Sequence, residues 1–220
     1  MSEVADSRPQ VLDRIRAATR NSVFTAEQAA GAYAQLAREY VQQGSLNAEG
    51  RLERMTERLR EYDADVVECA QEGLTVAIAA QLVASGRRRF VAPEGLPPEW
   101  LAEGFEWKID RDLAMSEVEQ AEGVVTSCFC GVAESGTIVL HHSATEGRRV
   151  ITLLPDWHLC VLRASEIVET LPEYFARCQQ PPPLVTWISG PSATADIEMT
   201  RIKGVHGPRF LRVILVRDKS

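Results

Sequence analysis

Apolar residues recur at helical spacing through the first quarter of the chain. Between Pro9 and Tyr62 this pattern predicts three helices, the second of which begins at the capping-box sequence Thr25-Ala-Glu-Gln28. Helices this short are marginal in water and need a surface on which to pack. We therefore expect residues 1–63 to form a helical extension of a larger domain that spans residues 64–220.

From Asp65 onwards, short apolar runs alternate with helical stretches. A strand over 66–70, an alanine-rich helix over 74–85 and a strand over 89–92 form a β-α-β unit, which implies parallel strands. Further strands are predicted over 105–109, 124–132, 137–141, 150–154, 157–162, 184–188 and 210–216, and further helices over 116–122, 167–178 and 195–201. The sequence thus predicts an α/β fold with a mostly parallel sheet flanked by helices.

Composition and charge narrow the class of protein. The net charge of −7 over 220 residues argues against a nucleic-acid surface, which needs clustered Lys and Arg. The chain has no apolar run long enough to cross a bilayer, and its polar, acidic start does not resemble a secretory signal. Five cysteines cannot all pair, which favours a reducing compartment. We expect a cytoplasmic protein that binds neither nucleic acid nor membrane.

The stretch from Leu184 to Glu198 predicts an anion site. A strand ends at a Gly-Pro pair, and hydroxyl residues follow where a helix over 195–201 would begin. The first amides of a helix lack internal partners and its dipole is positive there, so they attract anions, and a glycine lets a ligand approach the main chain. The candidate ligand-binding residues are Ser189, Gly190, Pro191, Ser192, Thr194 and Asp196. Ordinary capping and turn chemistry is the alternative.

Two other turns carry candidate chemistry. Glu134-Ser-Gly-Thr137 puts a carboxylate beside two hydroxyls, so Glu134 could act as nucleophile or base, with Ser135, Gly136 and Thr137 against a substrate. His206 lies between glycines and could bind a ligand or relay a proton, and Arg209 could form a fork for an anion. The alternatives are a plain hairpin turn, a turn histidine and a surface arginine.

The cysteines and histidines do not predict a metal site. The expected hairpin would place Cys128 opposite His141, but the Cys128-x-Cys130 spacing is unusual for zinc, and cysteine is often a small buried residue. There is no cysteine series for an iron–sulfur cluster and no glycine fingerprint for a nucleotide. We therefore predict neither a metal nor a cofactor on this chain.

Several of these motifs together resemble a known family. Trp187-Ile-Ser-Gly-Pro-Ser-Ala-Thr-Ala-Asp-Ile-Glu198, followed by Gly204-Val-His-Gly-Pro-Arg209, resembles the signature of the LUD-domain proteins, the lactate utilization protein C (LutC/YkgG) group. Ala133–Leu140 and Leu153–His158 resemble its upstream motifs. The resemblance implies a fold like that of the NagB/RpiA/CoA-transferase group. It also implies a role in oxidising L-lactate to pyruvate beside partner proteins that carry iron–sulfur clusters. Ala193 stands where the family usually has Arg, which removes one charged group from the predicted anion site. Arg148, Arg149 or Arg209 could substitute for it.

Two hypotheses of function follow. In the first, the chain is an accessory subunit of lactate oxidation that binds a small anion or organises its partners. In the second, it is a stand-alone enzyme on a fold like that of the CoA transferases and sugar-phosphate isomerases, with Glu134 acting on a small anionic substrate. Both hypotheses place the loop from Ser189 to Asp196 and the turn from Glu134 to Thr137 in one cleft, at the carboxyl ends of strands.

Overall fold

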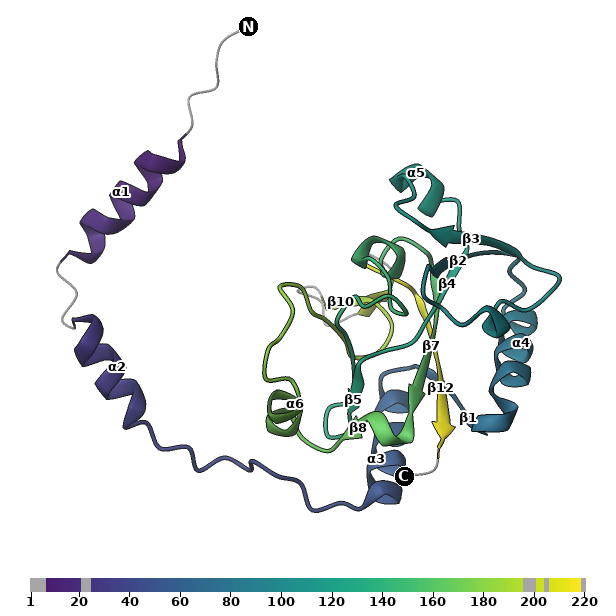
Figure 1. The fold of residues 1–220 in the computed structure, drawn as a ribbon, viewed down its shortest axis with the longest axis horizontal. Coiled ribbons are helices and arrows are strands. Elements are labelled where there is room, and N and C mark those ends of the chain that lie inside the picture. Colours follow the sequence, from purple (N-terminus) through teal and green to yellow (C-terminus); the bar gives the residue numbers. More distant parts are fainter. Residues whose placement is uncertain (1–6, 21–24, 196–200, 204–205, 219–220) are drawn as a thin grey trace, which may run out of the picture. The chain divides into compact units, whose positions relative to one another are not determined.

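The computed structural model describes residues 7–20, 25–195, 201–203 and 206–218, in two compact units (Figure 1). The first unit spans Met1–Tyr40, and its described helices are α1 (Arg8–Thr19) and α2 (Ala26–Ala34). The predicted capping box at the start of α2 is present, because Thr25 and Gln28 each accept the other's backbone N–H through a side-chain oxygen. The second unit spans Val41–Ser220. The domain boundary expected at residue 63 stays a prediction.

A six-stranded sheet forms the centre of the second unit. Its strands are β1 (Asp65–Ala70), β2 (Arg89–Pro93), β3 (Glu106–Asp110), β4 (Gly123–Thr126), β7 (Trp157–Arg163) and β12 (Phe210–Arg217). They lie in the order β1-β12-β7-β4-β2-β3, and every neighbouring pair is parallel. The predicted α/β class with a mostly parallel sheet is therefore confirmed. Strands β1 and β2 are parallel, as expected, but three strands separate them.

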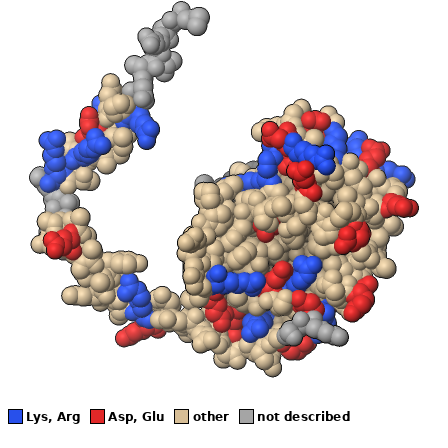
Figure 2. Space-filling model, in the orientation of Figure 1, with Lys and Arg blue, Asp and Glu red and all other residues tan. Residues whose placement is uncertain are grey.

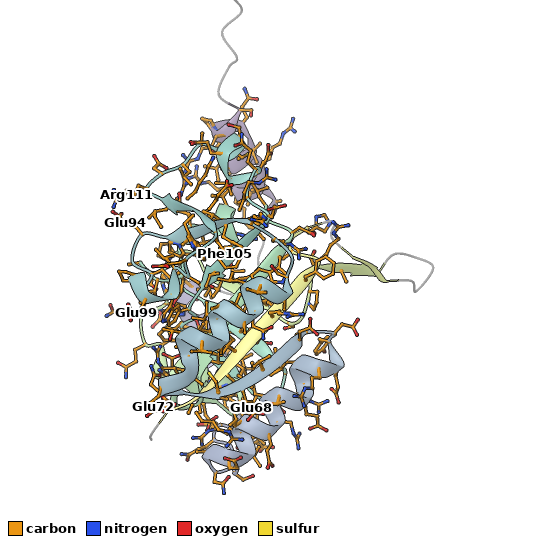
Figure 3. The ribbon with its side chains drawn as sticks, turned by 90° about the vertical axis from the view of Figure 1, so that its right-hand side faces the viewer. Glu68, Glu72, Glu94, Glu99, Phe105 and Arg111 are labelled. Atoms are coloured by element: carbon orange, nitrogen blue, oxygen red, sulfur yellow. The ribbon has the colours of Figure 1, made fainter. Side chains whose placement is uncertain are left out.

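Helices cover both faces of this sheet, as Figure 1 shows. Leu159 and Val161 of β7 pack in one core cluster with α4 (Leu74–Ala84), whereas Cys160 and Leu162 pack in another with α3 (Ala48–Glu61). A strand buried on both faces needs apolar side chains at every position, which explains its continuous apolar run. Figure 3 looks at the side of the sheet on which α4 lies. Its labelled Glu94 and Arg111 follow β2 and β3 and form an ion pair.

A second, four-stranded sheet has the order β8-β5-β6-β9. Its strands are β5 (Cys130–Val132), β6 (Thr137–Leu140), β8 (Ile167–Val168) and β9 (Thr186–Ile188). The predicted hairpin is confirmed, because β5 and β6 are antiparallel with Val132 opposite Thr137. The single strand predicted over 124–132 is wrong: β4 and β5 belong to different sheets, and the chain changes sheet between them.

The remaining elements are short, and two further predictions about them are wrong. They are α5 (Met115–Val118), α6 (Leu171–Arg177), η1 (Gln71–Gly73), η2 (Pro98–Trp100), η3 (Arg149–Thr152) and η4 (Ala164–Glu166), where η denotes a 3₁₀-helix. The run predicted as a strand over 150–154 overlaps η3, because a short apolar run fits either conformation. The helix predicted from residue 167 starts at Leu171, where Thr170 caps it and β8 precedes it.

The predicted helix over 195–201 is wrong at both of its described ends. Ala193–Ala195 forms strand β10 and Arg201–Lys203 forms β11, and the two strands pair antiparallel. Ser192, which was expected near the helix start, is held by the loop that precedes β12: its N–H donates to the carbonyl of Pro208, and its Oγ accepts from the N–H of His206. These contacts join residues distant in sequence and override the local helical preference. Asp196 lies outside the described residues.

Charged side chains of both signs are interspersed on the face of the second unit shown in Figure 2. Ion pairs between the described residues of this unit include those of Arg217 with Glu49 and Glu68. Within the part of the chain that the structure describes, no helix combines the length and the apolar character needed to span a membrane.

In one ion pair the carboxylate is buried, and loss of this pair should reduce the stability of the fold. Asp110 at the end of β3 has a side chain only 2% exposed, and it accepts from Arg148 Nε (2.9 Å) and Nη2 (2.6 Å). Burial opposes ionisation of Asp110, but the hydrogen bonds from Arg148 and from the N–H of Leu113 outweigh it and lower its pKa. We expect Asp110→Asn to reduce the free energy of unfolding by about 2 kcal/mol in urea titrations.

Asp112 provides a matched control for this prediction. It also accepts from Arg148 (2.7 Å), but its side chain is 88% exposed. Asp112→Asn should change the free energy of unfolding by less than about 0.5 kcal/mol, because water screens an exposed pair. Equal effects of the two variants would contradict the role assigned to burial.

Candidate functional site

A chain of hydroxyl groups joins the predicted turn to the predicted loop. Ser135 Oγ lies 2.8 Å from Thr137 Oγ1, which lies 2.7 Å from Ser189 Oγ. The antiparallel pairing of β6 with β9 produces this contact, because it places the start of one strand beside the end of the other. The structure therefore brings together three of the candidate residues, although they are up to 54 positions apart in the sequence.

The two candidate glycines face α3 and not an open space. Gly136 has φ +61°, and a Cβ there would lie 2.6 Å from Cβ of Arg58. Gly190 has φ +83°, and a Cβ there would lie 2.7 Å from the carbonyl oxygen of Tyr62. The space of the missing side chain is therefore taken by residues of α3 and its C-terminal end, and the approach of a ligand to the main chain of Gly190 stays a prediction. The small size of the two glycines lets the turn and the loop pack against the end of α3.

A cavity of about 310 Å³ adjoins the loop from Ser189 to Ala193. Its described walls are Arg149, Thr152, Leu153, His158, Thr186, Trp187, Ile188, Ser189, Gly190, Pro191, Ser192, Ala193, His206, Gly207, Pro208 and Leu211. They include five of the predicted ligand-binding residues: Ser189, Gly190, Pro191, Ser192 and His206. His158 and Leu211 are the second residues of β7 and β12, so the cavity lies at the amino ends of these strands. The predicted position at the carboxyl ends of strands is therefore wrong for these two strands of the central sheet, whereas Ser189 directly follows the carboxyl end of β9 in the second sheet.

Glu134 and Arg209 do not line this cavity. Glu134 is exposed on the hairpin turn, where its N–H donates to the carbonyl of Glu169. Both Nε and Nη2 of Arg209 donate to the carboxylate of Asp156, so this guanidinium is already paired. Thr194 lies in β10, whose side-chain placement is not described beyond Ala193.

Arg149 supplies the cationic side chain of the cavity wall. It is the first residue of η3, its side chain is exposed, and it forms no ion pair with another described residue. Its neighbour Arg148 differs, because it is held by Asp110 and Asp112. An unpaired guanidinium beside hydroxyl groups can bind a carboxylate or phosphate with two parallel hydrogen bonds.

His158 is the most buried titratable group of the described cavity wall. His158 is only 1% exposed, and its Nε2 lies 2.8 Å from Oγ1 of Thr126 on β4. Burial lowers the pKa of His158 to about 4, so its imidazole is neutral at pH 7. The candidate residues did not include His158, because a histidine within an apolar strand resembles an ordinary core residue.

The cysteines and histidines considered for a metal point to other partners. Cys128 Sγ donates to the carbonyl of Val161, and His141 stacks on Phe129 with ring centroids 3.7 Å apart. His142 bridges the carbonyl of Gly147 and the hydroxyl of Thr186 through its two ring nitrogens. Cys130 is also buried. Among the described residues, no three His, Cys, Asp or Glu side chains converge as metal ligands would.

This chain is similar to known proteins over most of its length. Residues 22–216 match the family model of the LUD domain. The chain is 41% identical over 170 residues to "Lactate utilization protein C" of Deinococcus radiodurans, covering 75% of this chain and 79% of that protein. It is 36% identical over 135 residues to the protein of the same name in Bacillus subtilis, covering 56% of each. The crystal structure of a DUF162 family protein from Deinococcus radiodurans superposes with a TM-score of 0.67 at 35% identity, covering 78% of this chain and 99% of that one.

Proposed function

This chain belongs to the LUD domain family. We propose that it is an accessory subunit in the oxidation of L-lactate to pyruvate, and that it binds a small anion in the cavity beside Ser189. Its relatives named lactate utilization protein C support a role in lactate utilization. The observation that supports the rest is the cavity itself, which is bordered by several hydroxyl groups and by Arg149, a residue that forms no ion pair with another described residue. As further parts of the proposal, the chain acts in the cytoplasm with iron–sulfur partner proteins that carry out the electron transfer.

The cavity has the chemistry expected of a site for a small carboxylate. Its described polar side chains include Arg149, Ser189 and Ser192, while Leu153, Ile188 and Leu211 provide apolar surface. Small-molecule sites combine such apolar walls with a few polar groups that fix the orientation of the ligand. Glu134 lies outside this wall, so the cavity gives no support to the alternative in which Glu134 acts as a nucleophile.

A binding measurement tests the anion site. We expect Arg149→Gln to weaken binding of pyruvate or L-lactate about tenfold in isothermal titration calorimetry, because a charge-assisted hydrogen bond contributes about 1.5 kcal/mol. Arg111→Gln is the matched control, since Arg111 pairs with Glu94 and is not part of the cavity wall. Equal affinities of wild type and Arg149→Gln would remove this arginine from the site.

A growth experiment tests the biological role. A bacterial strain that lacks its lactate utilization protein C should recover growth on L-lactate when it expresses this chain, and iron–sulfur proteins should co-purify with a tagged copy. Expression of the Arg149→Gln variant should restore growth less well. Normal growth of the deletion strain on L-lactate without any added copy would contradict the proposed role.

A further inference from the structure

His158 lies where three structural features meet. It is on β7, between β4 and β12, with Val124 and Leu211 as its partners in the sheet register. It also forms part of the cavity wall, although it is only 1% exposed. One ring nitrogen, Nε2, contacts Thr126, so the ring is held in a fixed orientation with Nδ1 as its remaining polar atom.

The hydroxyl of Thr126 determines which ring nitrogen carries the proton. Thr126 is fully buried, and among the described residues its hydroxyl contacts only His158. A buried hydroxyl hydrogen without an acceptor is costly, so Thr126 donates to Nε2 and Nε2 accepts. In a neutral imidazole the proton then lies on Nδ1.

The Nδ1–H group has no hydrogen-bond partner among the described residues. The buried side-chain nitrogen and oxygen atoms that lack a hydrogen bond within those residues are Nε of Arg51 and Nε of Arg58. Nδ1 of His158 is not one of these sealed atoms, and His158 borders the cavity. Buried polar groups are normally hydrogen-bonded, and such a donor therefore indicates a ligand or a water as its partner.

We propose that His158 is a ligand-binding residue whose neutral Nδ1–H donates a hydrogen bond to an acceptor oxygen of the small anion in this cavity. The proposal rests on the proposed function, because it requires an occupant of the same cavity. Arg149 would attract the negative charge, and His158 would select an oxygen of a carbonyl, carboxylate or hydroxyl group. An amine or a cation would meet an N–H donor and a guanidinium, so neither fits this site.

The position of the ring is consistent with a binding role. Burial keeps the imidazole uncharged at pH 7, so it donates a hydrogen bond without adding a second positive charge. The other basic residues of the described wall are Arg149 and His206. On the two strands that flank β7, the neighbours of His158 include Leu211 and Thr126, and neither carries a charge. Arg149 therefore recognises the charge of the anion, and His158 recognises one of its oxygen atoms.

Three substitutions at position 158 separate the two ring nitrogens. The amide nitrogen of Asn lies at about the distance of Nδ1 from the main chain, whereas that of Gln lies at about the distance of Nε2. With pyruvate as probe in isothermal titration calorimetry, His158→Asn should bind within about threefold of wild type. His158→Gln and His158→Leu should each bind about tenfold more weakly, which is the effect of one lost hydrogen bond to an anion.

The tautomer itself is measured in the unmodified protein, and only the comparison with Thr126→Val requires that a variant folds. Nitrogen-15 spectra of histidine-labelled protein at pH 7 should show a proton on Nδ1 of His158, with Thr126→Val removing that preference. A proton on Nε2 in the wild type would overturn the proposal.

The outcomes of the titrations are distinct. Wild-type affinity in folded His158→Gln and His158→Leu would overturn the role of His158 and leave the cavity as an anion site. If the wild type binds neither pyruvate nor L-lactate, the proposed function itself fails for these anions, and the role of His158 fails with it.

Discussion

Replacing Gly190 with alanine is expected to lower the free energy of unfolding by about 3 kcal/mol. Gly190 has φ +83°, a conformation that costs an alanine about 1 kcal/mol. The added Cβ would also lie 2.6 Å from Cβ and 2.7 Å from the carbonyl oxygen of Tyr62. The backbone of Tyr62 ends α3 and cannot move away without disturbing it, so overpacking adds about 2 kcal/mol. Urea unfolding at pH 7 measures the sum.

Gly104 separates the two contributions. It has φ +87°, almost the same backbone conformation, but a Cβ there meets no atom within 4 Å. Gly104→Ala should therefore cost about 1 kcal/mol, the conformational part alone. Equal losses in the two variants would show that the packing of the loop against α3 contributes nothing. A loss confined to Gly190→Ala would identify that contact as the main constraint on the loop that borders the cavity.

The central sheet was predictable because its signal is local. Strands β7 and β12 are buried on both faces, which requires the continuous apolar runs visible in the sequence. The helix α4 ends at Ala84, and Gly86 follows two residues later with a positive φ that fits a helix-terminating glycine. The exchange of sheets between β4 and β5 was not predictable, because an apolar run does not specify which neighbour it will pair with.

The described residues 192–195 and Arg201 show how distant contacts override local preference. Alanine and a preceding serine favour a helix start, but Ser192 bonds to His206 and Pro208, and β10 pairs with β11. The predicted anion site on helix amides is therefore wrong as a mechanism: at Ser192, the described amide is already occupied by a carbonyl of the protein.

The site was predictable in part, for the same reason. Ser189, Ser192 and His206 attract attention as polar residues next to turns, and the structure places all three in the cavity wall. Arg149 was named only as one of three arginines that could replace the family's usual Arg at position 193, and His158 gave no such signal. They come to the cavity only because the loop after β9 reaches the amino ends of β7 and β12, a contact that no local pattern encodes. The role of every wall residue in binding stays a prediction.

The neutral state of His158 should make the fold sensitive to mild acid. The pKa of His158 is about 4 in the folded chain, against 6.5 for an ordinary histidine. Between these values an unfolded chain binds a proton at this position and the folded chain does not, so stability falls as the pH decreases from about 6.5 to 4. The separation of the two pKa values corresponds to about 3 kcal/mol, and above pH 6.5 the contribution to stability is complete.

The variant His158→Asn isolates this contribution, because asparagine does not titrate. We expect the free energy of unfolding of the wild type to fall by about 3 kcal/mol relative to that of His158→Asn between pH 7 and pH 4, in urea titrations at four or five pH values. Burial also lowers the pKa of His141, but that histidine is present in both proteins and its effect cancels. Carboxylates with a lowered pKa, such as Asp110 and Asp156, are likewise common to both. The prediction is contradicted if the two curves of unfolding free energy against pH run parallel over this range. His158 would then bind a proton in the folded chain as readily as in the unfolded chain, and it could not act as a neutral donor in mild acid.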